Sequence, residues 1–441
     1  MRMKTLAAAF AGATLIAAAP AYAVTEIHWW HSNTGRNAEL IGKFVSEFNA
    51  SQSAYKVVAV YKGGYAESMS AAIAAYRAHN PPDIVQVFEV GTATMMAAKG
   101  AVVPVYKLMR DAHVKFDPKA YLPAVASYYT DTHGRMLSLP FNSSTTVLFY
   151  NKDMFRKAGL DPNKPPKTWE ELGEDATKIK ASGAACAFTT SWQSWVQLES
   201  MSAWENVPFA TLNNGFGGMG ARLTFNNPTM VEHIAFLEQM AKDGRFTYVG
   251  RSSAPDSKFY ADKDSCAMIT ESSASYGKTK KNAKFDFGIS ELPYHEGVKG
   301  APQNTIIGGA SLWVFSGKPK SHYKGIAEFF NFISSPKIQA EWHQVTGYAP
   351  ITVAAYELTK KEGFYKENPG TDIAVKQLLL NHPTNLSKGL RLGNMVQIRN
   401  INNEELEAVW TGKKSAKAAL DEAVKRGNAE LRKFERANRG K

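Results

Sequence analysis

The chain has 441 residues, a formal net charge of +12 and only two cysteines. This length exceeds what one hydrophobic core usually serves, so two lobes are expected. Beyond a short apolar run at the N-terminus, no stretch supplies the roughly 20 uninterrupted apolar residues that a membrane-spanning helix needs, which excludes an integral membrane protein.

The basic charge does not indicate a nucleic-acid partner. The lysines are scattered, and many of them lie in the last thirty residues, as on a solvated helix. Basicity suits an anionic ligand or a negatively charged surface, but most of this charge is that of an ordinary solvated exterior. The sequence therefore predicts a soluble monomer with no nucleic-acid partner.

The first 23 residues predict a signal peptide. Arg2 and Lys4 precede an apolar run over 6–19, and small residues surround the end of the segment at Ala23. Cleavage after Ala23 leaves 418 residues and lowers the formal charge to +10, because two basic residues are lost. The new N-terminus is then Val24 and not a cysteine, so lipid attachment is not expected. The mature chain is predicted to be free in the periplasm.

The following segment predicts strands and helices in alternation. Apolar residues recur with helical spacing within 36–51, and the helix over 65–79 ends before a Pro-Pro pair. This order predicts an α/β fold in which a parallel sheet carries helices on both faces and binds ligands beyond the carboxyl ends of its strands. The predicted strands are 26–30, 55–61 and 83–88, and the predicted helices are 36–51 and 65–79.

A second α/β region begins near Leu137. Thr168 and Glu171 form a capping-box pattern that opens a helix closed by Gly183. We expect one lobe to comprise residues 24–138 plus 300–338, and the other 139–299 plus 339–441. Further strands are predicted at 137–141, 145–150, from Cys186, from Cys266 and at 311–315, with helices from Trp192, over 230–242 and 323–333, and from Glu404 onward.

Cys186 and Cys266 each begin an apolar run typical of a strand. In an oxidising compartment they could form a disulfide, and they could equally be two buried thiols on neighbouring strands. Both interpretations stay open.

The sequence contains partial matches to cofactor motifs, but their surroundings do not fit the corresponding sites, and common catalytic motifs are missing. The glycines of 215–220 match G-x-G-x-x-G, but a strand-like run follows them where a dinucleotide site needs a helix. The run 277–279 resembles the end of a phosphate loop but lacks its first glycine, since Ser272 stands there. No G-x-S-x-G or H-E-x-x-H occurs, and the ten histidines lack ligand spacing. The sequence predicts no catalytic residues, no metal site and no cofactor.

Polar residues and glycines gather instead at predicted strand ends and in the adjoining loops. Singly, each has an ordinary explanation as a turn, a cap or a surface residue. In a two-lobed α/β protein such positions converge on a cleft, so together they favour a ligand site. They are Tyr65, Glu89, Ser143, Ser144, Ser272, Ser273, Gly308, Gly309, Tyr348 and Arg399.

Most of these residues lie within runs that resemble the periplasmic sn-glycerol-3-phosphate-binding proteins of Ugp-type ABC importers, part of the solute-binding family that includes maltose-binding protein. The resemblance covers nearly all of the mature chain, and its runs are long and contain rare residues. They are 61–65, 87–96 (VFEVGTATMM), 140–144, 191–195 (SWQSW), 301–304, 306–313 (IIGGASLW), 346–348 and 388–395.

The resemblance implies a two-lobed periplasmic binding protein fold whose hinge closes a cleft over sn-glycerol 3-phosphate, for delivery to the membrane subunits and ATPase of an importer. Whether glycerophosphodiesters also fit is left open. Two extra residues in 261–265, relative to the family pattern, leave the choice between Ser272 and Ser273 open. The implied ligand contacts are Tyr65, Glu89, Ser144, Ser272, Gly309, Tyr348 and Arg399, with Trp192 and Trp195 lining the cleft.

Charge assigns the expected roles. Arg399 is expected to bind the phosphate with two nitrogens, assisted by hydroxyls and the Gly309 amide, whereas Glu89 should avoid the phosphate and accept the glycerol hydroxyls. Trp192 and Trp195 are expected on one helical face capped by Ser191. The alternatives are the same fold holding a sugar or oligosaccharide and, less favoured, a secreted phosphoric-ester hydrolase.

Overall fold

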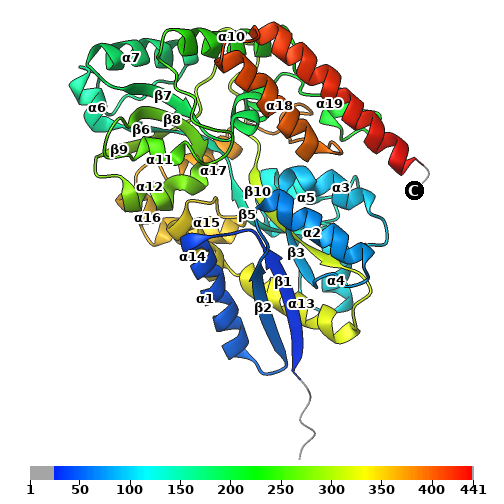
Figure 1. Cartoon of the computed structure of the whole chain (residues 1–441). Helices are drawn as coiled ribbons and strands as arrows, with labels where there is room; N and C mark the ends of the chain where they lie inside the picture. The colour runs from blue at the N-terminus through cyan, green and yellow to red at the C-terminus, as the bar shows by residue number, and fades with distance from the viewer. Residues whose placement is uncertain (1–23, 440–441) are drawn as a thin grey trace, which may run out of the picture.

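The computed structural model describes residues 24–439, so the predicted signal peptide lies outside the described residues. Two sheets, one of six strands and one of four, form the centres of two lobes (Figure 1). The two-lobed α/β fold is therefore confirmed. The residue limits expected for each lobe stay a prediction.

The six-stranded sheet carries the N-terminal half of the βαβ pattern. Its strands are β1 (Thr25–His31), β2 (Tyr55–Tyr61), β3 (Ile84–Phe88), β4 (Val102–Val103), β5 (Leu139–Ser144) and β10 (Gly308–Phe315). β1 pairs in parallel with β2 and β3, as predicted, whereas β10 runs antiparallel to β3, β4 and β5. The prediction of a parallel sheet is thus correct for β1, β2 and β3 and wrong for the sheet as a whole. The reason is that β10 enters the sheet in the antiparallel direction, after the chain has passed through the other lobe.

Helices cover this sheet by burying one apolar face each. In α1 (Gly35–Ser51) the five buried residues are those that helical spacing places on one side: Leu40, Ile41, Phe44, Val45 and Phe48. α2 (Tyr65–Arg77) follows β2, and α13 (Lys320–Ile333) packs on β1. Pro336 opens α14 (Pro336–Thr346), which packs on α1, so the proline ends one helix and starts the next.

The four-stranded sheet has the order β7–β8–β6–β9. Its strands are β7 (Cys186–Thr190), β8 (Cys266–Ser272), β6 (Thr146–Asn151) and β9 (Phe287–Ser290). Only β7 and β8 are parallel. Cys186 lies opposite Cys266 in that pair and is bonded to it, which decides the open question in favour of a disulfide.

Helices α7 (Trp169–Ala181), α10 (Pro228–Lys242), α18 (Met395–Trp410) and α19 (Ala416–Asn438) surround this second sheet (Figure 1). The predicted capping box opens α7: the Thr168 hydroxyl accepts from the Glu171 amide, and the Glu171 carboxylate accepts from the Thr168 amide. α19 packs along α18 and α10. These contacts fix α18, which carries Arg399.

The chain passes between the two sheets at Thr145, directly after β5. Ser143 and Ser144, expected between two strands, are the last residues of β5. Arg399, expected in a loop, lies in α18, because the helical pattern begins well before Glu404. The strand-like run after the glycines of 215–220 forms only a single bridge, Ala210 with Leu223.

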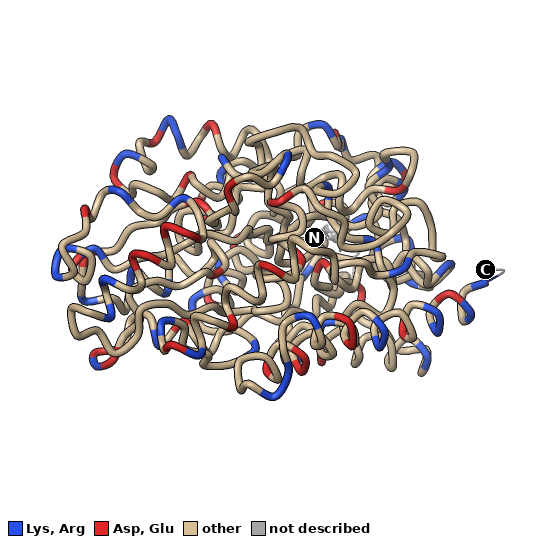
Figure 2. Tube along the Cα trace, turned by 90° about the horizontal axis from the view of Figure 1, so that it is seen from above, with Lys and Arg blue, Asp and Glu red and all other residues tan. Residues whose placement is uncertain are grey.

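The charged side chains are spread over the molecule. Lysine and arginine alternate with aspartate and glutamate along the trace, including the length of α19 (Figure 2). Among the described helices, none combines the length and the apolar character needed to cross a bilayer.

Candidate ligand-binding cleft

The strand register brings several predicted residues to one end of the six-stranded sheet. Gly308 pairs with Ser144, and Gly309 pairs with Ser143. Phe88 pairs with Ala310, so Glu89, the next residue along the chain, lies beside Gly309. The short helix that begins at Glu89 also contacts α18. Residues from three distant segments therefore meet where the two lobes face each other.

Gly309 has the backbone conformation of a residue that must be glycine. Its φ is +96°, and a Cβ there would lie 2.0 Å from the carbonyl oxygen of Asn142. The left-handed φ and the close approach of β5 both exclude a side chain.

A buried chain of amides positions Tyr65. The Tyr65 hydroxyl accepts a hydrogen bond from Nδ2 of Asn142 at 2.9 Å, and Oδ1 of Asn142 accepts one from Nε2 of Gln86 at 2.8 Å. The Tyr65 ring stacks on Phe88 with centroids 5.4 Å apart. The Tyr65 hydroxyl also shares a hydrogen bond with the Tyr348 hydroxyl. Sequence reasoning missed Gln86 and Asn142, whose buried positions within strands were the available signal.

Tyr348 lies against Tyr65. Burial raises the pKa of the Tyr348 phenol, and hydrogen bonds to Tyr65 and Asn142 oppose that shift. Its ring stacks on Trp342 at 5.6 Å. Both tyrosines are therefore neutral near neutral pH, and the structure brings these two predicted site residues together.

A wide helical turn over Trp195–Ser200, with π-type hydrogen bonds, presents Trp195 to the same region. A Cβ on Gly308 would lie 2.5 Å from Cζ2 of Trp195, so the indole packs directly on the glycine backbone. The Trp195 Nε1 is buried without a hydrogen-bond partner among the described residues. Wide turns of this type occur frequently at functional sites.

The position of Trp192 differs from the expectation that it shares a helical face with Trp195. Its φ is +46°, which places it ahead of the helical segment and not on a shared helical face with Trp195. Its amide donates to the carbonyl of Ser252 at 3.1 Å. Ser191 does not cap the helix, because its hydroxyl donates to the buried Glu271. The chain leaves β7 through a left-handed residue, which periodicity alone does not reveal.

Ser272 and Ser273 end β8 differently. The Ser272 hydroxyl accepts from the Ala274 amide at 3.2 Å and caps a short turn, whereas the Ser273 side chain contacts the Thr145 amide at 3.4 Å. Ser273 is buried and Ser272 is partly exposed. Ser272 is thus the serine that retains access to solvent.

Arg399 is bound by two carboxylates. Its Nε and Nη2 each lie 2.7 Å from the oxygens of Glu199, and Nη2 lies 2.5 Å from Oε1 of Glu89. The side chains of Glu89 and Glu199 are 4% and 1% exposed, against 15% for Arg399. This differs from the expectation that Arg399 offers two nitrogens to a phosphate, because Glu199 already occupies that edge. Sequence reasoning missed Glu199 entirely.

Glu89 and Arg399 shift each other's pKa. Burial raises the pKa of Glu89, and Arg399 opposes this rise. The two carboxylates raise the pKa of Arg399 against the effect of burial, so the guanidinium stays charged. Glu89 was expected to avoid the phosphate, and it contacts Arg399, the residue expected to bind the phosphate.

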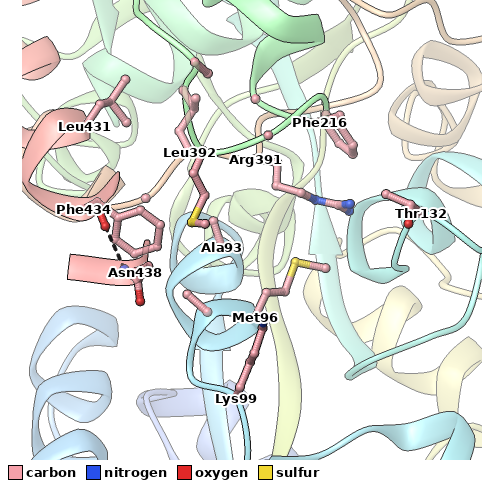
Figure 3. A pocket seen from close by; sticks show the side chains of 16 residues that line it. Ala93, Met96, Lys99, Thr132, Phe216, Arg391, Leu392, Leu431, Phe434 and Asn438 are labelled. Carbon is pink, nitrogen blue, oxygen red and sulfur yellow. Dashed lines mark hydrogen bonds between the residues drawn. The ribbon is translucent and has the colours of Figure 1, made fainter. Parts of the chain in front are cut away.

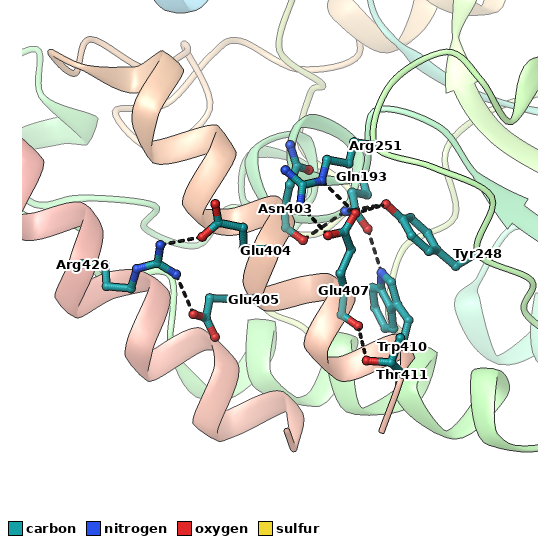
Figure 4. A network of polar contacts seen from close by, with 10 residues as sticks. All are labelled: Gln193, Tyr248, Arg251, Asn403, Glu404, Glu405, Glu407, Trp410, Thr411 and Arg426. Atoms are coloured by element: carbon teal, nitrogen blue, oxygen red, sulfur yellow. Dashed lines mark hydrogen bonds and ion pairs between the residues drawn. The ribbon is translucent and has the colours of Figure 1, made fainter. Parts of the chain in front are cut away.

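α18 is held in place by ion pairs on its far end (Figure 4). Glu407 accepts from Tyr248 at 2.6 Å and from Arg251 at 2.7 Å. Arg426 of α19 donates to Glu404 and Glu405. These contacts connect the far end of α18 to Tyr248, Arg251 and α19.

A separate apolar pocket of about 230 Å³ lies outside this cluster (Figure 3). Met96, Leu392 and Phe434 line it, and none of the predicted site residues does. Arg391 reaches from its rim to the carbonyl of Thr130 at 2.7 Å. Among residues 24–439, no group of three or more histidine, cysteine, aspartate or glutamate side chains is arranged to hold a metal ion.

Two α/β lobes with polar residues from distant segments meeting around Arg399 are typical of a solute-binding protein. Residues 43–372 match the family model of bacterial extracellular solute-binding proteins, and the chain belongs to this family. It is 54% identical over 427 residues, 97% of each chain, to the sn-glycerol-3-phosphate-binding periplasmic protein UgpB of Yersinia pseudotuberculosis. It is 52% identical to the UgpB of Pectobacterium atrosepticum, covering 99% of this chain and 98% of that one.

Solved structures show the same fold. UgpB from Mycobacterium tuberculosis in complex with glycerophosphocholine matches with a TM-score of 0.77 and 20% identity, covering 93% of this chain and all of that one. The cyclic α-maltosyl-1,6-maltose binding protein of Arthrobacter globiformis matches with a TM-score of 0.74 and 22% identity, covering 93% and 99%.

Proposed function

We propose that this protein captures sn-glycerol 3-phosphate in the periplasm and delivers it to an ABC importer, without chemical change to the ligand. The observation that carries the proposal is the convergence of Glu89, Gly309, Ser144 and Arg399 at the facing ends of the two lobes. The identity of 54% over nearly the whole chain to proteins named for this ligand supports it.

The phosphate end of the ligand is assigned to neutral donors. The Ser144 and Ser272 hydroxyls, the Gly309 amide and the phenols of Tyr65 and Tyr348 belong to the segments that meet at the end of β5 and β10. Hydroxyls and amides bind phosphate oxygens without carrying charge. This assignment moves the phosphate away from Glu89, whose carboxylate would repel it.

The glycerol end is assigned to Glu89 and Arg399. Glu89 accepts from a ligand hydroxyl, and Nη1 of Arg399, which has no hydrogen bond or ion pair among residues 24–439, donates to one. Trp195 and Trp192 cover the carbon backbone of the ligand. Arg399 thus retains its role as a ligand contact, with the hydroxyls and not the phosphate as its target.

The two alternatives make different demands on the cleft. A sugar-binding protein of this fold would use the aromatic side chains as stacking platforms, but Trp195 packs against Gly308 and is only 5% exposed. A phosphoric-ester hydrolase would need a nucleophile paired with a base. The hydroxyls of Ser191, Ser272 and Ser273 contact backbone or carboxylate groups and not a histidine.

Calorimetric titration tests the proposal. Residues 24–441 are titrated with sn-glycerol 3-phosphate, glycerophosphocholine, inorganic phosphate and maltose, and released phosphate is assayed in parallel. We expect saturable one-site binding of glycerol 3-phosphate and no phosphate release. A response to maltose alone would establish the sugar-binding alternative, and phosphate release with turnover would establish the hydrolase.

A further inference from the structure

Glu199 is a buried carboxylate that faces the proposed ligand site but has no place among the expected contacts. Its two oxygens hold Nε and Nη2 of Arg399, both at 2.7 Å. Its side chain is 1% exposed. It therefore covers one complete edge of the only guanidinium that the described cleft contains, and a ligand can reach only the remaining nitrogen, Nη1.

The local fold holds Glu199 in this position from both sides. Glu199 belongs to the wide turn that also carries Trp195, so one turn presents an indole and a carboxylate to the same cleft. The Ser194 hydroxyl donates to Oε1 of Glu199 at 3.2 Å, and Asn402 of α18 donates to Ser194 at 3.1 Å. The carboxylate is thus tied to the helix that bears Arg399, one turn away, and the pair moves as a unit.

The contacts also offset the charge of Arg399. Two acidic side chains, Glu89 and Glu199, contact one guanidinium, and they use two of its three nitrogens. Charges interact strongly in a buried site, so the pairing of Arg399 bears directly on a nearby ligand charge. A ligand hydroxyl can donate to Glu89, whereas an anionic group meets acidic side chains and a guanidinium that is already paired.

We propose that Glu199 is a specificity-determining residue: by covering one edge of Arg399 and offsetting its charge, it makes this end of the cleft accept neutral hydroxyls and reject a second anionic group. The inference rests on the proposed function, since it requires a ligand with one phosphate end and one polyol end. It predicts that the protein separates glycerol phosphates from phosphorylated hydroxy acids of the same size.

The test compares two ligands that differ only at that end. In 3-phospho-L-glycerate, which has the same arrangement at C2, a carboxylate replaces the terminal hydroxymethyl group of sn-glycerol 3-phosphate. We expect the unaltered protein to bind glycerol 3-phosphate at least about 100-fold more tightly by calorimetry. Glu199→Gln, which keeps the size of the side chain but removes its charge, should narrow this ratio at least about tenfold, and Glu199→Asp, which restores the charge, should widen it again.

Glu205→Gln is the matched control, because it removes a buried carboxylate in the same lobe that contacts His295 and not Arg399. Its ligand ratio should equal that of the unaltered protein. An unchanged ratio in Glu199→Gln overturns the inference and leaves the proposed function intact. Equal binding of both ligands by the unaltered protein has the same consequence, and that measurement needs no variant. Failure of the unaltered protein to bind glycerol 3-phosphate overturns the proposed function itself.

Discussion

Arg399 of α18 contacts Glu89 at the end of β3, a residue 310 positions away, with Nη2 and Oε1 2.5 Å apart. α18 packs beside the four-stranded sheet, whereas β3 belongs to the six-stranded sheet (Figure 1). The contact therefore connects α18 to the end of the six-stranded sheet at the proposed ligand site.

Arg399→Ala should abolish measurable binding of glycerol 3-phosphate and lower the free energy of unfolding by about 3–5 kcal/mol, because it leaves two buried carboxylates without their cation. Calorimetry and urea denaturation measure the two effects. Arg251→Ala is the matched control on an exposed pair with Glu407 of the same helix, and it should cost under about 1 kcal/mol with binding retained. An unchanged dissociation constant for Arg399→Ala would remove Arg399 from the site.

Gly309→Ala should lower affinity at least about tenfold. The added Cβ would lie 2.0 Å from the carbonyl oxygen of Asn142, so β10 must move away from β5 at the point where the ligand is expected. A shift of Asn142 would also displace Tyr65, because the two side chains are hydrogen-bonded. Gly317→Ala is the matched control: its φ of +83° imposes a similar backbone strain, but no atom lies within 4 Å of the new Cβ. The control should lose about 1 kcal/mol of stability and bind normally. Equal affinities in both variants would contradict the role of Gly309.

Local signals in the sequence predicted much of the fold. The apolar stripe of α1 and the capping box of Thr168 depend only on residues within a few positions of one another, and both are confirmed. The antiparallel insertion of β10 depends on a return of the chain after more than a hundred residues in the other lobe, which no local pattern encodes.

The candidate site likewise combines features that could be predicted from the sequence with features that could not. The meeting of Glu89, Gly309 and Arg399 followed from the family resemblance, which carries long-range information that periodicity lacks. Glu199 was missed because a glutamate in an apolar helical run has no distinguishing spacing, and the wide turn that aims it at Arg399 is a property of hydrogen bonding and not of residue type. The left-handed φ of Trp192 was missed for the same reason.

Removal of the disulfide should weaken the fold without altering the site. Cys186 and Cys266 lie at the beginning of β7 and β8, whereas Ser272 lies at the opposite end of β8. The bond closes a loop with a sequence separation of 80, so Cys186→Ala combined with Cys266→Ala should lower the free energy of unfolding by about 2–4 kcal/mol. The affinity for glycerol 3-phosphate at 25 °C should stay the same. A large loss of affinity in a folded double variant would show that the bond also shapes the cleft.

Glu205 predicts a pH dependence of stability. It is fully buried, and among residues 24–439 only one of its oxygens has a partner, the His295 amide at 2.8 Å. Burial raises its pKa to about 7, with the His295 hydrogen bond opposing and Glu170 adding to the rise. The unfolded chain ionises this carboxyl at its ordinary pKa near 4.5, so the folded state binds more protons between pH 4.5 and 7. Its contribution is neutral below that window, and the folded state loses stability as the pH rises through it.

Urea denaturation from pH 5 to 8 measures this contribution. Glu205→Gln keeps the acceptor oxygen but cannot ionise, so its stability relative to the unaltered protein should increase with pH by up to about 3 kcal/mol. Glu39→Gln, at an exposed position of α1, is the control, and its difference from the unaltered protein should stay constant over the same range. Parallel pH curves for Glu205→Gln and the unaltered protein would show that the buried carboxyl stays in one protonation state throughout, because a proton released in this window must appear as a change in the free energy of unfolding.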